Sequence, residues 1–218
     1  MAIKKEFYIE PSAHVLCVGM TGSGKSFLAE EFLKGYDNVI KLDTKQETDE
    51  RYAKGESPWR GLEEGEDFEV CYSLDECQRS DFNKIIYCVP FEEQNEDTFN
   101  DFFSWVYQRQ NTIIWIDELM SIGTARRYPA QLHRVMVMGR SKNVGVWSCT
   151  QRPQSIPVIV PANCKYFFVF CLADEDDRKS LVRSTGFPEL KHMPGDIEDH
   201  EFWSVKLGNK RAIKAVLK

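Results

Sequence analysis

The sequence lacks any apolar run of the roughly 20 residues that a helix needs to cross a bilayer. We also expect that its start is not a secretory leader, because Lys4 and Lys5 are followed by a mixed polar stretch and not by an apolar segment. These two absences predict a protein that is not itself embedded in a membrane and that stays inside the cell where it is made.

Cysteine spacings typical of zinc sites are also missing. The chain has seven cysteines, but none form a C-x₂-C pair, and Cys71 and Cys77 stand six positions apart. Cys17, Cys88 and Cys149 lie in apolar runs typical of buried strands, where cysteine behaves as a small hydrophobic residue. We therefore expect reduced and mostly buried thiols, and no structural zinc.

An excess of basic residues is absent as well. The net charge of −6 argues against a protein that coats nucleic acid by bulk attraction, although a few basic loops could still grip DNA. Acidic side chains are concentrated within a polar stretch at about residues 48–80, which we call the acidic segment and predict to be an irregular insertion. A solvated outer face explains its charge better than a metal site does.

What is present is an alternation of short apolar strands and amphipathic helices. This pattern predicts one α/β domain over residues 1–218, with a mostly parallel central sheet flanked by helices. A pair of strands around Gly208 and Asn209 predicts a C-terminal antiparallel hairpin. The strands are expected at 14–19, 38–42, 84–89, 112–116, 144–149 and 166–171, the hairpin at 201–207 and 211–216, and the main helices at 26–34, 97–108, 129–142 and 174–185.

One segment between the first strand and the first helix matches the pattern G-x-x-x-x-G-K-[ST] in full. Its glycines allow backbone N–H groups to point at phosphate oxygens. We expect Lys25 to reach the β- and γ-phosphates and the Ser26 hydroxyl to ligate Mg²⁺. The motif predicts an ATP site formed by Gly19, Met20, Thr21, Gly22, Ser23, Gly24, Lys25, Ser26 and Phe27.

Two acidic residues follow the strand at 112–116. Asp117 is predicted to hold magnesium together with Ser26, and Glu118 to polarise the attacking water. This pair favours a hydrolase over a small-molecule kinase, which needs no carboxylate to activate water. Gln151, after the strand at 144–149, is expected to touch the γ-phosphate or the water, although in isolation it would be an ordinary strand-end residue. Together these motifs predict a P-loop NTPase fold of the RecA-like (ASCE) type.

The sequence resembles the FtsK–HerA family of DNA-pumping ATPases over roughly residues 12–207. The resemblance is carried by Gly19–Ser26, Leu42–Lys45, Ile116–Glu118 and, above all, Gly139–Pro153 with its T-Q-R-P ending. It implies a homo-oligomeric ring, a hexamer or a pentamer, that threads double-stranded DNA without regard to sequence. It also implies a sensor role for Gln151 and an arginine supplied by a neighbouring subunit. Arg140 is the first candidate for that arginine, followed by Arg183 and Arg178.

The loop Ser121–Tyr128 follows the acidic pair and contains Gly123, Arg126 and Arg127. A flexible basic loop of this kind suits contact with DNA phosphates. A solvated surface loop that happens to hold two arginines explains the same residues equally well, so both interpretations stay open.

Cellular members of the family carry additional domains that this sequence does not show. A bare motor of this size is similar to the genome-packaging ATPases of viruses with an internal membrane, which drive DNA into a preformed capsid. That similarity implies a capsid vertex protein or a membrane protein as partner and a location in the host cytoplasm, with incorporation at a virion vertex left open. A pump for conjugation or repair and a nucleotide-dependent assembly factor that moves no DNA remain alternatives.

Overall fold

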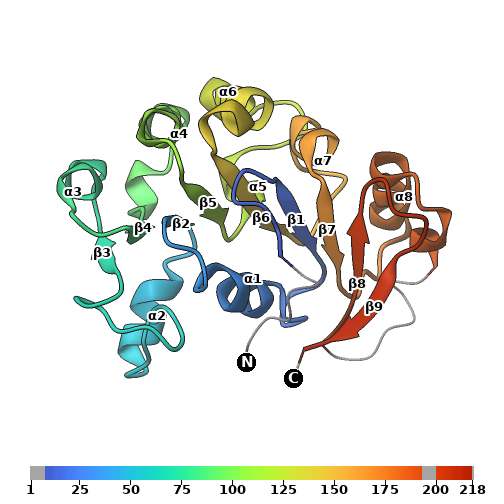
Figure 1. Cartoon of the computed structure of the whole chain (residues 1–218), viewed down its shortest axis with the longest axis horizontal. Helices are drawn as coiled ribbons and strands as arrows, with labels where there is room; N and C mark the ends of the chain where they lie inside the picture. Colours follow the sequence, from blue (N-terminus) through green and yellow to red (C-terminus); the bar gives the residue numbers. More distant parts are fainter. Residues whose placement is uncertain (1–7, 193–199, 218) are drawn as a thin grey trace.

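The computed structural model describes residues 8–192 and 200–217 (Figure 1). The strands are β1 Val15–Val18, β2 Val39–Asp43, β3 Glu69–Cys71, β4 Lys84–Cys88, β5 Ile113–Ile116, β6 Gly145–Thr150, β7 Tyr166–Val169, β8 Glu201–Lys206 and β9 Ile213–Val216. The α-helices are α1 Lys25–Leu33, α2 Glu47–Ala53, α3 Leu74–Arg79, α4 Glu96–Arg109, α5 Leu119–Ile122, α6 Ala130–Met138, α7 Ile159–Asn163 and α8 Glu175–Thr185. Short 3₁₀ helices lie at η2 Phe91–Glu93, η3 Gly139–Lys142 and η4 Pro188–Lys191.

These strands form one sheet in the order β3-β4-β2-β5-β6-β1-β7-β8-β9. Every pairing from β3 to β7 is parallel, whereas β8 and β9 add antiparallel strands at the far edge. The predicted fold class is therefore confirmed, including the C-terminal antiparallel hairpin. Since β6 lies between β1 and β5, the order also places β6, which Gln151 follows, next to β5, which Asp117 and Glu118 follow.

Alternate residues of the buried strands pack into two separate cores, because successive side chains of a strand point to opposite faces. In β5, Ile114 and Ile116 join one core while Ile113 and Trp115 join the other. Figure 1 shows α1 and α2 on one face of the sheet and α4, α6 and α8 on the other. The near-continuous apolar sequence of the central strands follows from this double cover.

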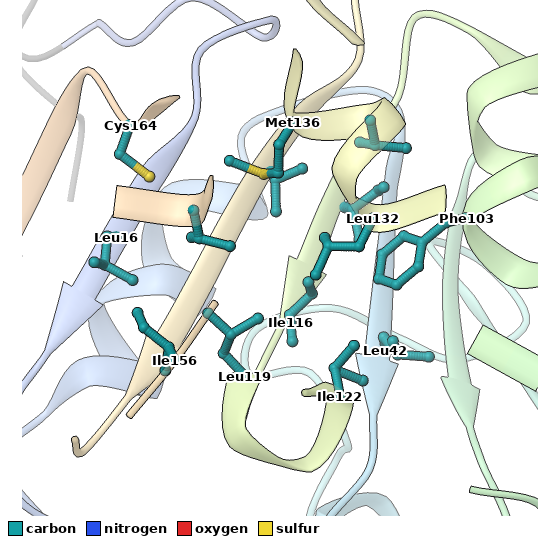
Figure 2. Close-up of a cluster of buried hydrophobic side chains, with 14 of the residues drawn as sticks. Leu16, Leu42, Phe103, Ile116, Leu119, Ile122, Leu132, Met136, Ile156 and Cys164 are labelled. Carbon is teal, nitrogen blue, oxygen red and sulfur yellow. The ribbon is translucent and has the colours of Figure 1, made fainter. Parts of the chain in front are cut away.

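The core under α4 and α6 is shown in Figure 2. Phe103 from α4 and Leu132 and Met136 from α6 point toward the sheet residues Leu42 and Ile116. All five side chains are at most 1% exposed. This packing fixes the carboxyl ends of β2 and β5 relative to each other. It thereby also sets the positions of the polar residues that follow those strands.

The acidic segment is more regular than predicted. It contains α2, the edge strand β3, which pairs in parallel with β4, and α3. Helix α3 begins with a capping box, in which the Ser73 hydroxyl accepts from the Glu76 N–H and the Glu76 carboxylate accepts from the Ser73 N–H. Trp59 and Phe68 from the same segment are fully buried against the α1 side of the sheet. The prediction of an irregular insertion is therefore wrong. The prediction followed the polar composition of the segment and gave too little weight to the capping sequence of α3 and to the two buried aromatic residues.

All seven cysteines are free thiols, and six of them are buried, as predicted. The predicted helix at 129–142 ends earlier than expected, at Met138, and continues as the 3₁₀ turn η3. Gly139 permits this tightening, because a Cβ there would lie 2.9 Å from the Val144 carbonyl oxygen.

Candidate functional site

The predicted nucleotide-binding residues gather where parallel strands end at the same edge of the sheet. The loop after β1 leads into α1, Asp117 and Glu118 follow β5, and Gln151 follows β6. Ligands of open α/β sheets bind outside the carboxyl ends of the strands, and these side chains meet there.

The loop Gly19–Ser26 depends on glycine at particular positions. Gly22 has φ 76° and Gly24 has φ 104°, in the region that favours glycine. A Cβ on Gly19 would lie 2.5 Å from the Cβ of Phe170, so no side chain fits there. Gly24 is also the N-cap residue of α1. The nine-residue helix therefore begins at Lys25, within the motif Gly19–Ser26. The loop thus places a curled backbone at a positive helix end, which suits a bound phosphate.

Lys25 lies at the first position of α1 and is only 7% exposed. Its Nζ donates to the carbonyl oxygen of Met20 at 2.8 Å, which folds the side chain back across the loop. Burial lowers the pKa of Lys25. The Lys25 ammonium therefore lies against the backbone of the loop. A bound anion would receive both a positive charge and a hydrogen-bond donor from it.

Asp117 is almost fully buried and accepts a hydrogen bond from the Ser26 hydroxyl, with 2.7 Å between Oγ and Oδ1. Burial acts to raise its pKa, but the cations of Lys45 and Lys41 and the Ser26 hydrogen bond together hold the pKa of Asp117 below its ordinary value. A charged carboxylate beside a hydroxyl is a donor set that fits Mg²⁺. No group of three or more His, Cys, Asp or Glu side chains is arranged for a metal within the described residues, so the remaining ligands would be water and phosphate.

Glu118 is linked to the loop after β1 through Gln151. One carboxylate oxygen of Glu118 accepts from the Met120 N–H at the start of α5, and the other accepts from the Gln151 amide, both at 3.4 Å. The amide oxygen of Gln151 in turn accepts from the Thr21 hydroxyl at 2.8 Å. The structure therefore joins three segments predicted separately, and Thr21 has a specific partner that its motif position alone did not indicate.

Lys45 belongs to the same cluster, and the sequence interpretation gave it no role there. Its Nζ lies 3.1 Å from Oδ2 of Asp117 and 3.7 Å from Oε2 of Glu118. Burial acts to lower the pKa of Lys45, but the attraction of the Asp117 carboxylate for the ammonium is stronger. The pKa of Lys45 therefore lies above its ordinary value. The sequence offers two signals for Lys45, its place just after the strand at 38–42 and the match of Leu42–Lys45 to the FtsK–HerA pattern, but its contact with Asp117 depends on β2 lying next to β5.

A hollow of about 400 Å³ lies beside the start of α1. Phe27 lines it together with Arg60 from the acidic segment, and the Arg60 guanidinium lies 5.1 Å from the centre of the Phe27 ring. His200 and Leu217 also line the hollow. Phe27 therefore borders a hollow that is lined by three distant parts of the chain. Its contact with nucleotide stays a prediction.

Arg140 is not brought to this site. It lies on η3, which precedes β6, and so stands at the amino ends of the strands beside His14. The loop Gly19–Ser26 follows β1 at the opposite, carboxyl edge, because β1 and β6 run in parallel. A role for Arg140 in the site of its own chain is thereby excluded, and its predicted role in a neighbouring subunit stays a prediction.

Arg126 and Arg127 lie in the connection between α5 and α6 and are both exposed. The loop is closed by a hydrogen bond from the Thr124 N–H to the Arg127 carbonyl at 2.7 Å. The Arg127 guanidinium pairs with Glu96 at 3.0 Å. The loop begins four residues after Asp117, so it is covalently close to the acidic pair, and DNA contact by these arginines stays a prediction.

Comparison with known proteins agrees with this geometry. A model of the ATPase family associated with various cellular activities (AAA) matches residues 15–170. No curated protein matches the sequence. Every helix in the described parts of the chain is too short or too polar to span a membrane.

Solved structures with the same fold include the genome packaging NTPase B204 from Sulfolobus turreted icosahedral virus 2 in complex with AMPPCP. It is 17% identical, with 94% of this chain and 97% of that chain covered and a TM-score of 0.68. VirB4 of Thermoanaerobacter pseudethanolicus is 12% identical, with 94% and 89% covered and a TM-score of 0.62. The pCW3 conjugation coupling protein TcpA, in its monomer form with ATPγS, is 15% identical, with 93% and 59% covered and a TM-score of 0.54. The predicted resemblance to packaging ATPases is thus confirmed as a likeness of fold.

Proposed function

Because the chain belongs to the ATPase family associated with various cellular activities (AAA), we propose that it hydrolyses ATP with Mg²⁺ and uses the reaction to move double-stranded DNA. The observation that carries this proposal is the hydrogen-bonded path from Thr21 through Gln151 to Glu118. It connects the loop that would hold the phosphates to the carboxylate that would act on water. Such a path lets the state of the nucleotide influence a second element, which a motor requires and a passive binding site does not.

Each step of hydrolysis has a residue in a suitable place. We expect the backbone of Gly19–Ser26 to hold the phosphates and Lys25 to exchange its Met20 carbonyl partner for phosphate oxygen. Ser26 and Asp117 would hold Mg²⁺, which supplies charge neutralisation at the phosphates. Glu118 would orient the attacking water and take its proton, with Gln151 fixing the carboxylate.

The nucleoside end of ATP has a natural place in the hollow beside α1. Phe27 offers an aromatic face, and Arg60 can stack on a base or donate to it. Structures of similar fold bind AMPPCP and ATPγS, which supports nucleotide as the ligand. The acidic segment would thereby contribute to ATP binding through a basic residue.

Coupling to DNA would run through the short helix α5. Glu118 caps α5, and Arg126 and Arg127 lie in the connection that follows that helix. A change in the contacts of Glu118 therefore has only a four-residue helix to cross before it reaches the loop. Contact with backbone phosphate alone would make the grip independent of sequence.

The favoured biological role is the packaging of a viral genome into a preformed capsid. It is supported by the fold shared with a genome packaging NTPase over 97% of that chain. In this role the chain would form a homo-oligomeric ring, a hexamer or pentamer of the FtsK–HerA kind, in which Arg140 completes the site of a neighbour. The ring would work in the host cytoplasm or at a virion vertex, against a capsid or membrane protein.

A conjugation-type DNA pump is the second candidate, and the likeness to the coupling protein TcpA supports it. An assembly factor that moves no DNA is separated from both pumps by a displacement assay. In that assay, the protein and ATP are mixed with linear duplex DNA that carries a triplex-forming oligonucleotide near one end. A translocase releases the oligonucleotide and Glu118→Gln does not, whereas an assembly factor leaves the triplex intact in both cases.

A further inference from the structure

We infer that Lys45 is a positioning residue whose ammonium group lies where a divalent cation would otherwise balance the charges of Asp117 and Glu118. The inference rests on the proposed function, since it assumes that these carboxylates serve Mg²⁺-dependent hydrolysis. It adds a role for a residue outside the loop Gly19–Ser26 and outside the acidic pair.

The contacts of Lys45 carry the inference. Its Nζ lies 3.1 Å from Oδ2 and 3.5 Å from the carbonyl oxygen of Asp117, and 3.7 Å from Oε2 of Glu118. Both carboxylates are buried, with 1% and 8% of each residue exposed. Two neighbouring buried negative charges are costly without a cation, and Lys45 supplies one on the side that the Ser26 hydroxyl leaves open.

The backbone that carries Lys45 is fixed by three hydrogen bonds. The Asp43 carboxylate, which is fully buried, accepts from the Lys45 N–H at 3.1 Å and from the Thr48 N–H at 2.8 Å. The Gln94 amide donates to the Thr44 carbonyl at 2.8 Å. The position of the Lys45 backbone is therefore set by the turn between β2 and α2. The contact with Asp117 does not depend on the conformation of the lysine side chain alone.

Lys41, four residues earlier in β2, shows what distinguishes Lys45. The Lys41 side chain is 0% exposed, and its Nζ lies 3.5 Å from Oε2 of Glu47 and 4.7 Å from the centre of the Trp115 ring. The Lys45 side chain is 38% exposed and can withdraw. The carboxylates would accept a metal readily only when nucleotide phosphates offer the ammonium another partner, so magnesium and ATP would enter together.

The test uses the full chain without ATP or DNA. The melting temperature of the wild type and of Lys45→Met is measured in about 10 mM MgCl₂ and in about 30 mM NaCl, which have similar ionic strength. We expect MgCl₂ to raise the melting temperature of Lys45→Met by about 3 °C and that of the wild type by less than about 1 °C. Lys34→Met, which removes a half-exposed lysine paired with Glu31, is the matched control and should respond like the wild type.

An equal response of Lys45→Met and the wild type to MgCl₂ would overturn the inference. If Lys45→Met does not fold, Glu118→Gln in the same chain removes one of the two facing charges. Recovery of folded protein supports the role of Lys45, and no recovery overturns it. Because neither measurement involves DNA or hydrolysis, its failure is distinguishable from failure of the proposed motor function.

Discussion

Gln151 is the residue on which the communication between phosphate and water depends. It accepts from Thr21 at 2.8 Å and donates to Glu118 at 3.4 Å, so its loss frees both partners. We expect Gln151→Ala to lower kcat by about tenfold or more while the KM for ATP changes little, because Lys25 and the loop backbone still hold the phosphates. Steady-state kinetics would measure both values.

Thr21→Val gives a matched test of the same path. It removes only the hydroxyl that donates to the amide oxygen of Gln151 and keeps the shape of the side chain. Its kcat should fall in the same direction by a smaller factor. An unchanged kcat in Gln151→Ala would contradict the path, and an effect confined to KM would assign Gln151 to binding alone.

Single residues were predictable where a motif fixes their surroundings. Lys25, Ser26 and Asp117 belong to patterns whose strand and helix context is part of the motif, and the structure brings Ser26 and Asp117 to 2.7 Å. Lys45 was not assigned a role because its contact with Asp117 depends on β2 and β5 being neighbours, which local sequence does not state. DNA contact by Arg126 and Arg127 is a question about a partner and stays open to experiment.

Among the elements, the start of β1 is held by a buried histidine. The neutral ring of His14 accepts from the Val146 N–H at 3.1 Å and contacts the Met136 carbonyl at 3.1 Å, so it connects β1 with β6 and α6. Burial lowers the pKa of His14 to about 4 from the 6.5 of an exposed ring, helped by the nearby charge of Arg140. Between these two values the unfolded chain binds a proton that the folded chain does not.

Stability should therefore fall as the pH drops from about 6.5 to about 4, and level off for this group below that. The shift corresponds to about 3 kcal/mol of the free energy of unfolding. Urea unfolding at a series of pH values would measure it, with His14→Gln as the comparison because its own side chain does not titrate. If both proteins lose the same free energy across this window, His14 does not contribute as argued.

The acidic segment contributes Arg60 to the nucleotide side of the molecule. The Arg60 guanidinium faces Phe27 at 5.1 Å in the hollow beside α1, and its side chain is 50% exposed. We expect Arg60→Ala to raise the KM for ATP by about three- to tenfold with kcat nearly unchanged, since a cation and aromatic contact is lost far from the reacting phosphate. Arg79→Ala, an exposed arginine elsewhere in the segment, is the control and should leave both constants unchanged. A KM for Arg60→Ala equal to that of the wild type would exclude the hollow as the nucleoside site.

Elements were predictable from the sequence where apolar periodicity was strong. The predicted strand at 112–116 and helix at 97–108 match β5 and α4 within one or two residues, because both bury an uninterrupted apolar face. The acidic segment defeated the same reasoning, since its anchors Trp59 and Phe68 are isolated aromatic residues in polar surroundings. Periodicity detects a buried face but not a single buried side chain.

For the whole molecule, the loop with Arg126 and Arg127 is the predicted contact with DNA. Both arginines are exposed, but Arg127 is already paired with Glu96. We expect Arg126→Ala to weaken binding of unrelated duplexes equally and to reduce the slope of log K against log salt by about one, because one phosphate contact is lost. Arg127→Ala should have a smaller effect. An unchanged slope in Arg126→Ala, measured by fluorescence anisotropy, would favour the alternative of a solvated surface loop.

Steady-state ATP hydrolysis with and without double-stranded DNA is the experiment that decides whether the proposed reaction at Glu118 is coupled to DNA. The measurement should cover a wide range of protein concentrations, because the proposed ring would form only when enough protein is present, with Glu118→Gln as the blank. We expect a several-fold rise in rate with DNA of any sequence, lost at high salt and absent in Glu118→Gln. Hydrolysis that proceeds at the same rate with and without DNA across those concentrations would contradict it.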